Sequence, residues 1–119
     1  MINVKRVTLL LVLLTLALSL FANAKQSQEI DVVVTPNPMK DYTEIICALP
    51  SSSSISLVIT DEKGIVVKSL FTGQLEKGKH SFSWDGTDYR NMRLPEGTYI
   101  AELSGNSKFT SIKRFILLK

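Results

Sequence analysis

The stretch "WDGTDYRNMRLPEGTY", from Trp84 to Tyr99, places turn-forming residues between two aromatic residues. Glycine and asparagine tolerate a positive φ, proline fixes a turn, and aspartate accepts hydrogen bonds from backbone amides close to it. A chain that crosses from one β-sheet to another needs these properties, so the stretch predicts the corner of a β-sandwich. We expect a positive φ at three of its positions, Gly86, Asn91 and Gly97.

The carboxylates of the same stretch allow a second interpretation, a calcium site at Asp85, Asp88 and Glu96. Calcium takes about six to eight oxygen ligands, which dedicated binding loops supply at closely alternating positions. Here the acids are spread over 12 residues without that spacing, so we expect no metal and no cofactor. Instead, Asp85 and Asp88 are expected to bond backbone amides of the corner. Leu94 and Met92 are expected to cover the edge of the core.

On both sides of this corner, apolar residues alternate with polar ones in short runs closed by Gly, Pro, Asn or Ser. This period of two is typical of an all-β sandwich, and nothing after the first 24 residues has a helical period. Seven strands are predicted, over residues 30–35, 42–49, 55–60, 65–71, 80–84, 98–104 and 108–119. Residues 61–64 join the third and fourth strands as a hairpin, whereas 51–54 and 73–79 are expected to be loops. Val67 and Leu70 can both face the core only if a bulge intervenes.

The N-terminus has the pattern of a cleavable signal peptide, residues 1–24. A basic pair precedes an apolar run over residues 7–21, and Ala22-Asn23-Ala24 forms the cleavage site. A membrane anchor is the alternative, but 15 residues at about 1.5 Å each span roughly 22 Å, short of a hydrocarbon core of about 30 Å. Lys25 stands where a lipid anchor would need a cysteine.

The chain is therefore expected to be exported to the periplasm, the cell surface or the medium, without a membrane span once the signal is removed. Residues 25–33 then form a short lead-in, and residues 34–119 form one domain, since about 95 residues suffice for a single core. Of the 14 basic residues, Lys5 and Arg6 belong to the signal, which leaves 12 against 11 acidic ones. These are scattered singly, without the row that would neutralise phosphates, so no nucleic acid partner is expected.

The single cysteine, Cys47, cannot form an internal disulfide. It alternates in phase with Ile45 and Leu49, which predicts a buried strand residue. A catalytic thiol would need a histidine partner, and only His80 is available, at the start of a strand where a structural role is the commoner one. The sequence contains no phosphate-binding glycine loop and no His/Cys metal spacing. We therefore expect that the protein is not an enzyme.

Five segments in order resemble a known family: "TPNPMKDYTEIICALP", "ISLVITDEKGIVVKSL", "GKHSFSWDGTD", "PEGTYIAEL" and "KRFILLK". They are similar to the C-terminal sorting domain (type A) of proteins exported by the type IX secretion system, and to the Ig-like domain of the flagellar hook-capping protein. The similarity runs from Val34 to Lys119. It implies an Ig-like β-sandwich of about seven antiparallel strands. The family's recurrent positions fall on Pro36, Asn37, Pro38, Asp61, Gly64, Trp84, Asp85, Gly86, Asp88, Gly97 and Tyr99.

The chain departs from this family in two ways. Asn91 stands where the family usually has a glycine after the "WDGxD" segment, and asparagine keeps the turn because it tolerates a positive φ. A sorting domain normally follows a large passenger, whereas here only the short lead-in separates the signal from the domain. The domain itself is then expected to carry the function.

Two functions are consistent with this sequence. The first is a non-enzymatic exported protein recognised, like a type IX sorting domain, by outer-membrane translocon components. By family analogy, the recognition surface would include the final strand with Lys113, Arg114 and Lys119, although that strand is equally explained as an ordinary edge or core strand. The alternative is a periplasmic or cell-surface Ig-like adhesion or assembly module that binds a protein partner through a sheet edge or end loop. Flagellar hook capping ranks third, because a hook-capping protein is not expected to carry a cleavable signal.

Overall fold

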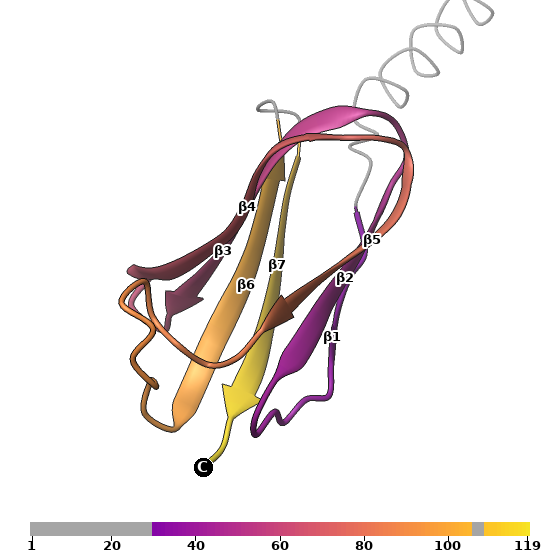
Figure 1. Cartoon of the computed structure of the whole chain (residues 1–119). Coiled ribbons are helices and arrows are strands. Elements are labelled where there is room, and N and C mark those ends of the chain that lie inside the picture. The colour runs from indigo at the N-terminus through magenta and orange to yellow at the C-terminus, as the bar shows by residue number, and fades with distance from the viewer. Residues whose placement is uncertain (1–29, 106–108) are drawn as a thin grey trace, which may run out of the picture.

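The computed structural model describes residues 30–105 and 109–119, which form two layers of strands (Figure 1). The strands are β1 (Val32–Thr35), β2 (Thr43–Leu49), β3 (Ser53–Asp61), β4 (Val66–Leu75), β5 (Gly78–Trp84), β6 (Gly97–Gly105) and β7 (Phe109–Leu117). The predicted all-β class with seven strands is confirmed. Within the described residues, no helix is long and apolar enough to cross a membrane. The predicted signal peptide, residues 1–24, lies outside them.

Each layer is an antiparallel sheet, as an Ig-like sandwich requires. One sheet has the order β1-β2-β5 and the other the order β4-β3-β6-β7. The chain changes sheet three times, between β2 and β3, between β4 and β5, and between β5 and β6. The stretch from Trp84 to Tyr99 contains the last of these crossings, so it is a corner between the two sheets, as predicted.

Alternating side chains of the two sheets fill the core, of which Trp84, Phe115 and Met39 are the largest fully buried members. The ring of Trp84 lies with its centroid 5.6 Å from that of Tyr99 and 5.6 Å from that of Phe115. Tilted and edge-on aromatic pairs at this separation stabilise a core beyond the burial of their area. The corner therefore begins and ends on two side chains that pack against each other.

β4 and β5 extend further than the sequence predicts. The expected loop 73–79 shrinks to Glu76 and Lys77, because β4 continues to Leu75 and β5 begins at Gly78. Glycine is rare inside strands, so Gly73 concealed the continuation of β4. The consequence is that β4 and β5, joined by a two-residue turn, belong to different sheets and do not pair with each other.

Other boundaries differ by one to three residues. β3 begins at Ser53, inside the serine run that was expected to be a turn, while β1 and β2 begin at Val32 and Thr43, later than predicted. β7 ends at Leu117, before the end of the chain. The serine run misleads because serine is a turn former by composition, yet Ser53 is buried against the core and its hydroxyl donates to the Ser51 carbonyl at 3.2 Å.

The predicted bulge in β4 is present, and there are two. The register between β3 and β4 shifts at two points, which leaves Leu70 and Val67 without partners on β3. Each extra residue moves the following side chains to the other face of the strand. Both Leu70 and Val67 consequently pack against the core despite their spacing of three.

Candidate functional site at the corner and the chain end

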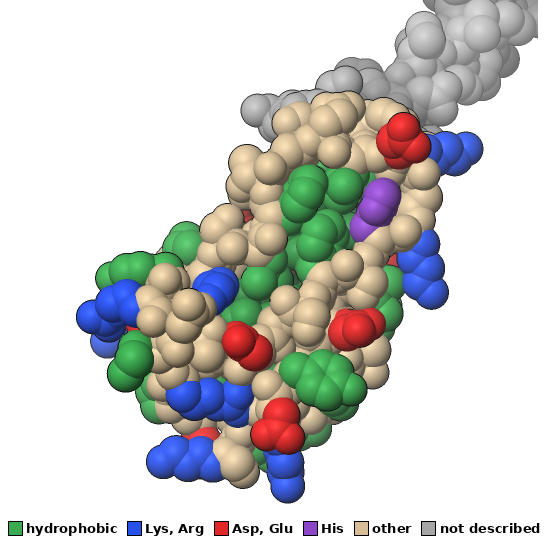
Figure 2. All heavy atoms as spheres, in the orientation of Figure 1, with side chains coloured by type: hydrophobic (Ala, Val, Ile, Leu, Met, Phe, Trp, Pro, Cys, Tyr) green, Lys and Arg blue, Asp and Glu red, His purple; other side chains and the backbone are tan. Residues whose placement is uncertain are grey.

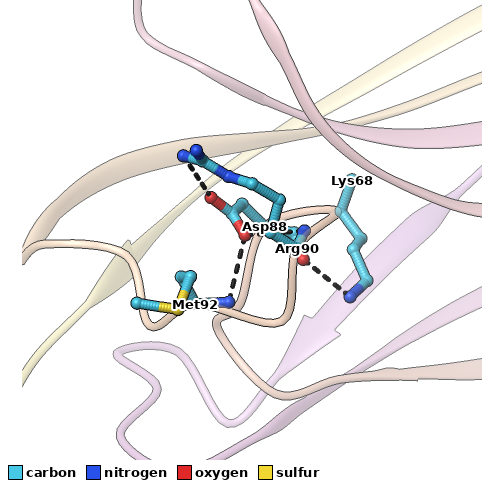
Figure 3. A network of polar contacts seen from close by, with 4 residues as sticks. All are labelled: Lys68, Asp88, Arg90 and Met92. Atoms are coloured by element: carbon cyan, nitrogen blue, oxygen red, sulfur yellow. Dashed lines mark hydrogen bonds and ion pairs between the residues drawn. The ribbon is translucent and has the colours of Figure 1, made fainter.

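Asp88 organises the middle of the corner (Figure 3). Its Oδ1 accepts the backbone N–H of Arg90 at 2.9 Å and that of Met92 at 3.0 Å, and its Oδ2 lies 3.4 Å from the Arg90 guanidinium. The carboxylate is buried, with only 8% of the residue exposed. The amide of Met92 contributes most to holding the pKa of this carboxyl below its ordinary value, with the Arg90 amide and charge adding to the effect. Asp88 therefore serves the turn as a charged hydrogen-bond acceptor.

The same turn occurs a second time in the chain, at Asp61. Asp61 Oδ1 accepts the N–H groups of the residues two and four positions later, at 2.9 Å each, as Asp88 does. In both turns the third residue after the aspartate has a positive φ, 84° at Gly64 and 61° at Asn91. Its N–H donates to the aspartate carbonyl, at 3.1 Å and 2.9 Å respectively. Asn91 thus does what a glycine does in the equivalent turn.

Lys68, on β4 of the four-stranded sheet, holds this turn in place. Its Nζ donates to the Asp88 carbonyl at 2.9 Å, to Asn91 Oδ1 at 3.0 Å and to Thr87 Oγ1 at 3.2 Å. Figure 3 shows the first of these contacts. An ammonium group has three N–H donors, so these oxygens satisfy all of them. The ammonium group of Lys68 is therefore held by hydrogen bonds to the corner.

Asp85 holds the start of the corner. It accepts hydrogen bonds from both the N–H and the hydroxyl of Thr87, and the carbonyl of Thr87 in turn accepts the indole N–H of Trp84 at 2.9 Å. The Thr87 hydroxyl is the main cause that lowers the pKa of the Asp85 carboxyl. Through Thr87, these contacts connect the buried Trp84 to the first turn of the corner.

Arg93 joins the corner to the two other segments at this end of the sandwich. Its guanidinium donates to the backbone carbonyl of Asp85 at 2.6 Å, and it also contacts the carbonyls of Lys40 and Leu118. The side chain passes so close to Gly86 that a Cβ there would lie 2.6 Å from the guanidinium nitrogen. Gly86 also has a φ of 79°. The position therefore requires glycine for two reasons, its positive φ and the space that Arg93 occupies.

The Pro36-Asn37-Pro38 segment and the residue after it clasp the end of β7. Asn37 Oδ1 accepts the N–H of Ile116 at 3.0 Å. Met39 pairs in parallel with Leu117 and exchanges backbone hydrogen bonds of 2.8 Å with Ile116 and Leu118. The Thr35-Pro36 and Asn37-Pro38 peptide bonds are cis. This segment therefore ends β1 and also completes the edge of β7.

Glu96 and Tyr99 close the corner on its other side. Glu96 Oε1 accepts the backbone N–H of Lys119 at 2.8 Å. The hydroxyl of Tyr99 donates to the carbonyl of Pro95 at 2.7 Å, an arrangement known in β-sandwiches as a tyrosine corner. Burial, with a smaller contribution from the charge of Asp61, raises the pKa of this hydroxyl.

The sequence-predicted candidates are thus only partly brought together. Asp85 and Asp88 share one loop, but Glu96 binds the chain end instead of joining them. In residues 30–105 and 109–119, no three side chains of the Asp, Glu, His or Cys type are grouped as a metal site would require. Met92 is 62% exposed and does not cover the core, contrary to expectation, whereas Leu94 does pack against it. At Gly97 φ is 158°, so all three positions of the corner at which a positive φ was expected have one.

Cys47 and His80 lie directly opposite each other on β2 and β5, a pairing that the sequence did not reveal. The thiol is buried, and burial raises its pKa, which is the reverse of what a nucleophilic thiolate needs. His80 Nε2 lies 2.8 Å from the carbonyl oxygen of Glu76, at the base of the β4–β5 turn. Their contacts are those of structural residues.

The basic residues of the last strand do not form one cluster. Lys113 and Arg114 are consecutive in β7, so their side chains point to opposite faces of the sheet, and Lys119 lies beyond the strand. Phe115 and Leu117, between them and the chain end, are core residues. Sequence reasoning missed the contacts of Lys68 and Arg93. Only the repeated Asp-x-x-Gly/Asn spacing could have indicated the turn that Lys68 supports.

The comparison with protein families supports one of the two resemblances that the sequence offered. Residues 40–108 match the model of the FlgD Ig-like domain. The chain belongs to this family. The matched segment includes β2 to β6 and hence the whole corner.

Full-length relatives of the family are longer than this chain. The basal-body rod modification protein FlgD of Escherichia coli is 34% identical over 62 residues, which are 52% of this chain and 27% of that protein. Its counterpart in Salmonella typhimurium is 31% identical over 61 residues, 51% of this chain and 26% of that protein. This FlgD-like chain thus spans about a quarter of the length of these curated relatives.

Solved structures show the same fold. FlgD from P. aeruginosa matches with a TM-score of 0.52 and 31% identity, over 76% of this chain and 69% of that one. Dimeric latent PorU from Porphyromonas gingivalis matches with a TM-score of 0.61 and 21% identity, over 75% of this chain and 9% of that one. PorZ from the same organism is described as an essential surface component of the type IX secretion system. It matches with a TM-score of 0.50 and 22% identity, over 74% of this chain and 11% of that one. At these identities, the likenesses to PorU and PorZ concern the fold alone.

Proposed function

We propose that this protein is a non-enzymatic Ig-like assembly module that works outside the cytoplasm by binding another protein. Membership of the FlgD Ig-like family carries the proposal, because relatives of that family are named for modification of the basal-body rod, a task of assembly. The contacts of the corner agree with it. The carboxylates of Asp85, Asp88 and Glu96 each bond backbone or side-chain groups of the fold, as expected of a scaffold.

Deleting the gene in the source organism, followed by electron microscopy of the cell envelope, tests this function. We expect a surface or envelope structure to be absent or incomplete, and to be restored by the wild-type chain. A photo-crosslinking residue at the exposed position Tyr89 should capture a protein of the cell envelope, whereas one at the buried position Leu57 should not. Normal envelope structures, together with no captured protein, would refute the proposal.

Sorting by the type IX system is a second candidate, supported by the fold shared with PorZ and by the exposed basic residues of β7. Removing the end of the chain would not test it, since Phe115 and Leu117 are buried and their loss would unfold the domain. We instead expect replacement of Lys113, Arg114 and Lys119 by serine to keep the fold and to change where the protein accumulates.

A matched control removes the same charge elsewhere, through serine at the exposed residues Lys40, Lys63 and Lys77. Cell fractionation of both triple variants should show the wild-type distribution for the control and retention in the periplasm for the β7 variant. The same distribution for both variants would rule out sorting through these residues.

A further inference from the structure

The two sheets have four edge strands, two on each side of the sandwich, and the edges are covered on one side only. On one side lie β1 and β7, and this side is closed by contacts within the chain. The Ser111 hydroxyl donates to the Ile30 carbonyl at 2.7 Å, and the backbone of Met39 forms hydrogen bonds with the carbonyl of Ile116 and the N–H of Leu118. The end of the last strand is therefore already paired and offers little free edge.

On the other side lie β4 and β5, and this side is open. Among the described residues, each of these strands pairs with one neighbour only, β3 and β2 respectively. Apolar side chains that are only partly buried gather between them: Leu70, Phe71, Leu75 and Phe82. Figure 2 shows a band of hydrophobic atoms exposed in a hollow on this face, beside the only histidine. Phe71 on β4 and Phe82 on β5, with ring centroids 5.3 Å apart, connect the two sheets on this side.

Of these two edges, that of β5 is suited to pairing. β5 keeps an unbroken register with β2 over all 7 of its residues, and none of the residues after Gly78 has a positive φ. β4 is interrupted by the two bulges at Leu70 and Val67. Bulges in an edge strand hinder the addition of a further strand, whereas a regular, unpaired edge is a template for one.

The charges on this side indicate the chemistry of the partner. β4 and β5 carry Lys68, Lys79 and His80 and no aspartate or glutamate. Lys68 is bound by the corner, while Lys79 is exposed at the start of β5. In the turn between the strands, Glu76 and Lys77 offset each other, and Glu44 on β2 accepts a hydrogen bond from Ser81 of β5. Glu44 lies opposite Ser83, four residues along the strand from Lys79. Among the described residues Lys79 forms no ion pair, and no carboxylate on β4 or β5 offsets its positive charge.

We propose that the free edge of β5 binds an extended segment of another protein, with apolar side chains at alternate positions and acidic residues between them. Backbone groups of β5 pair with those of the segment, its apolar side chains cover the band between β4 and β5, and its carboxylates lie beside Lys79. This inference rests on the proposed assembly function, for which it names the binding surface and the kind of partner.

The test uses the full chain and a blocked synthetic peptide of alternating valine and glutamate. We expect binding that Lys79→Glu weakens about fivefold, as reversal of a rim charge does. Lys113→Glu, the same change on the closed side, should leave the affinity unchanged. A valine–lysine peptide should bind more weakly than the acidic one, and N-methylation of alternate peptide amides, which removes backbone donors, should abolish binding. Hydrogen exchange of the β5 amides should slow in the complex, as strand addition requires.

Three results would overturn the inference: equal binding of the N-methylated peptide, no protection of β5 amides in the complex, or an effect of Lys113→Glu larger than that of Lys79→Glu. No binding of the acidic peptide would overturn it as well. These outcomes are separable from failure of the assembly function, because photo-crosslinking at Tyr89 would still capture a partner in cells if that function holds through another surface.

Discussion

At the scale of single residues, the corner is built from a turn that the chain uses twice. Asp61 and Asp88 each accept two backbone N–H groups, and the residue three positions later takes a positive φ. The chain fills that position with Gly64 in one turn and Asn91 in the other. A carboxylate used in this way is a substitute for missing backbone pairing, which gives the acidic residues of the loop a structural role.

Gly86 and Gly64 give a matched test of the corner. Both have a positive φ, 79° and 84°, but a Cβ at Gly86 would meet Arg93 at 2.6 Å while one at Gly64 would meet nothing within 4 Å. Gly64→Ala should cost about 1–2 kcal/mol of unfolding free energy through strain alone. Gly86→Ala should cost about 1 kcal/mol more, because Arg93 must leave the carbonyls that it joins. Denaturant titration measures both costs.

The Arg93→Ala background supplies the control for this pair. Without the guanidinium, an added Cβ at Gly86 has no obstacle, so the two alanine substitutions should then cost the same. If Gly86→Ala stays the more damaging change in that background, Arg93 is not the reason that the position requires glycine.

Acid should remove part of the stability through Asp85 and Asp88. Hydrogen bonds from Thr87 and Met92 hold the pKa of these carboxyls below the ordinary 3.8, so both are more acidic in the folded state. Their stabilisation is complete above the unfolded pKa and is lost as the pH falls through the folded pKa. The stability difference between the wild type and Asp85→Asn/Asp88→Asn should therefore shrink between about pH 5 and pH 2. A difference that stays constant in a pH series of denaturant titrations would contradict this.

At the scale of strands, period-two patterning predicted every element but not all of their ends. Alternation identified the seven strands because one side of each faces a common core. It could not predict that β4 runs through Gly73, since a glycine inside a strand looks like a loop until its neighbours are paired. Nor could it place Met39, whose burial depends on a parallel contact with Leu117, far away in the sequence.

Two methionines test the clasp on β7. Met39, the residue of segment 36–39 that pairs with Leu117, is fully buried, while Met92 in the corner is 62% exposed. Met39→Ala should cost about 2–5 kcal/mol, the usual range for emptying a core position, whereas Met92→Ala should stay within about 0.5 kcal/mol. Equal costs in a denaturant titration would mean that segment 36–39 does not close the sandwich as described.

At the scale of the whole molecule, the candidate site joins segments that the sequence keeps apart. The corner, the segment around Pro36 and the chain end meet through Arg93 and Glu96. Composition predicted a corner, and the family resemblance pointed to the residues that matter in it. The partners of Arg93 and Lys68 could not be predicted, because a long basic side chain gives no sequence pattern for the carbonyls that it reaches. The open side between β4 and β5 likewise follows only from the sheet order.

Calcium is the ligand that would change this view of the corner, and thermal melting of the full chain tests for it. The oxygens of Thr87, Asp88 and Asn91 already surround the ammonium of Lys68, so a cation there would meet a positive charge at bonding distance. We expect the same melting midpoint with excess calcium and with chelator. An ion at one hundred times its dissociation constant would add about 2.7 kcal/mol to the folded state, which for a domain of this size raises the midpoint by roughly ten degrees or more. Such a rise, lost in Asp85→Asn and Asp88→Asn, would make the corner a metal site, with Lys68 displaced from it.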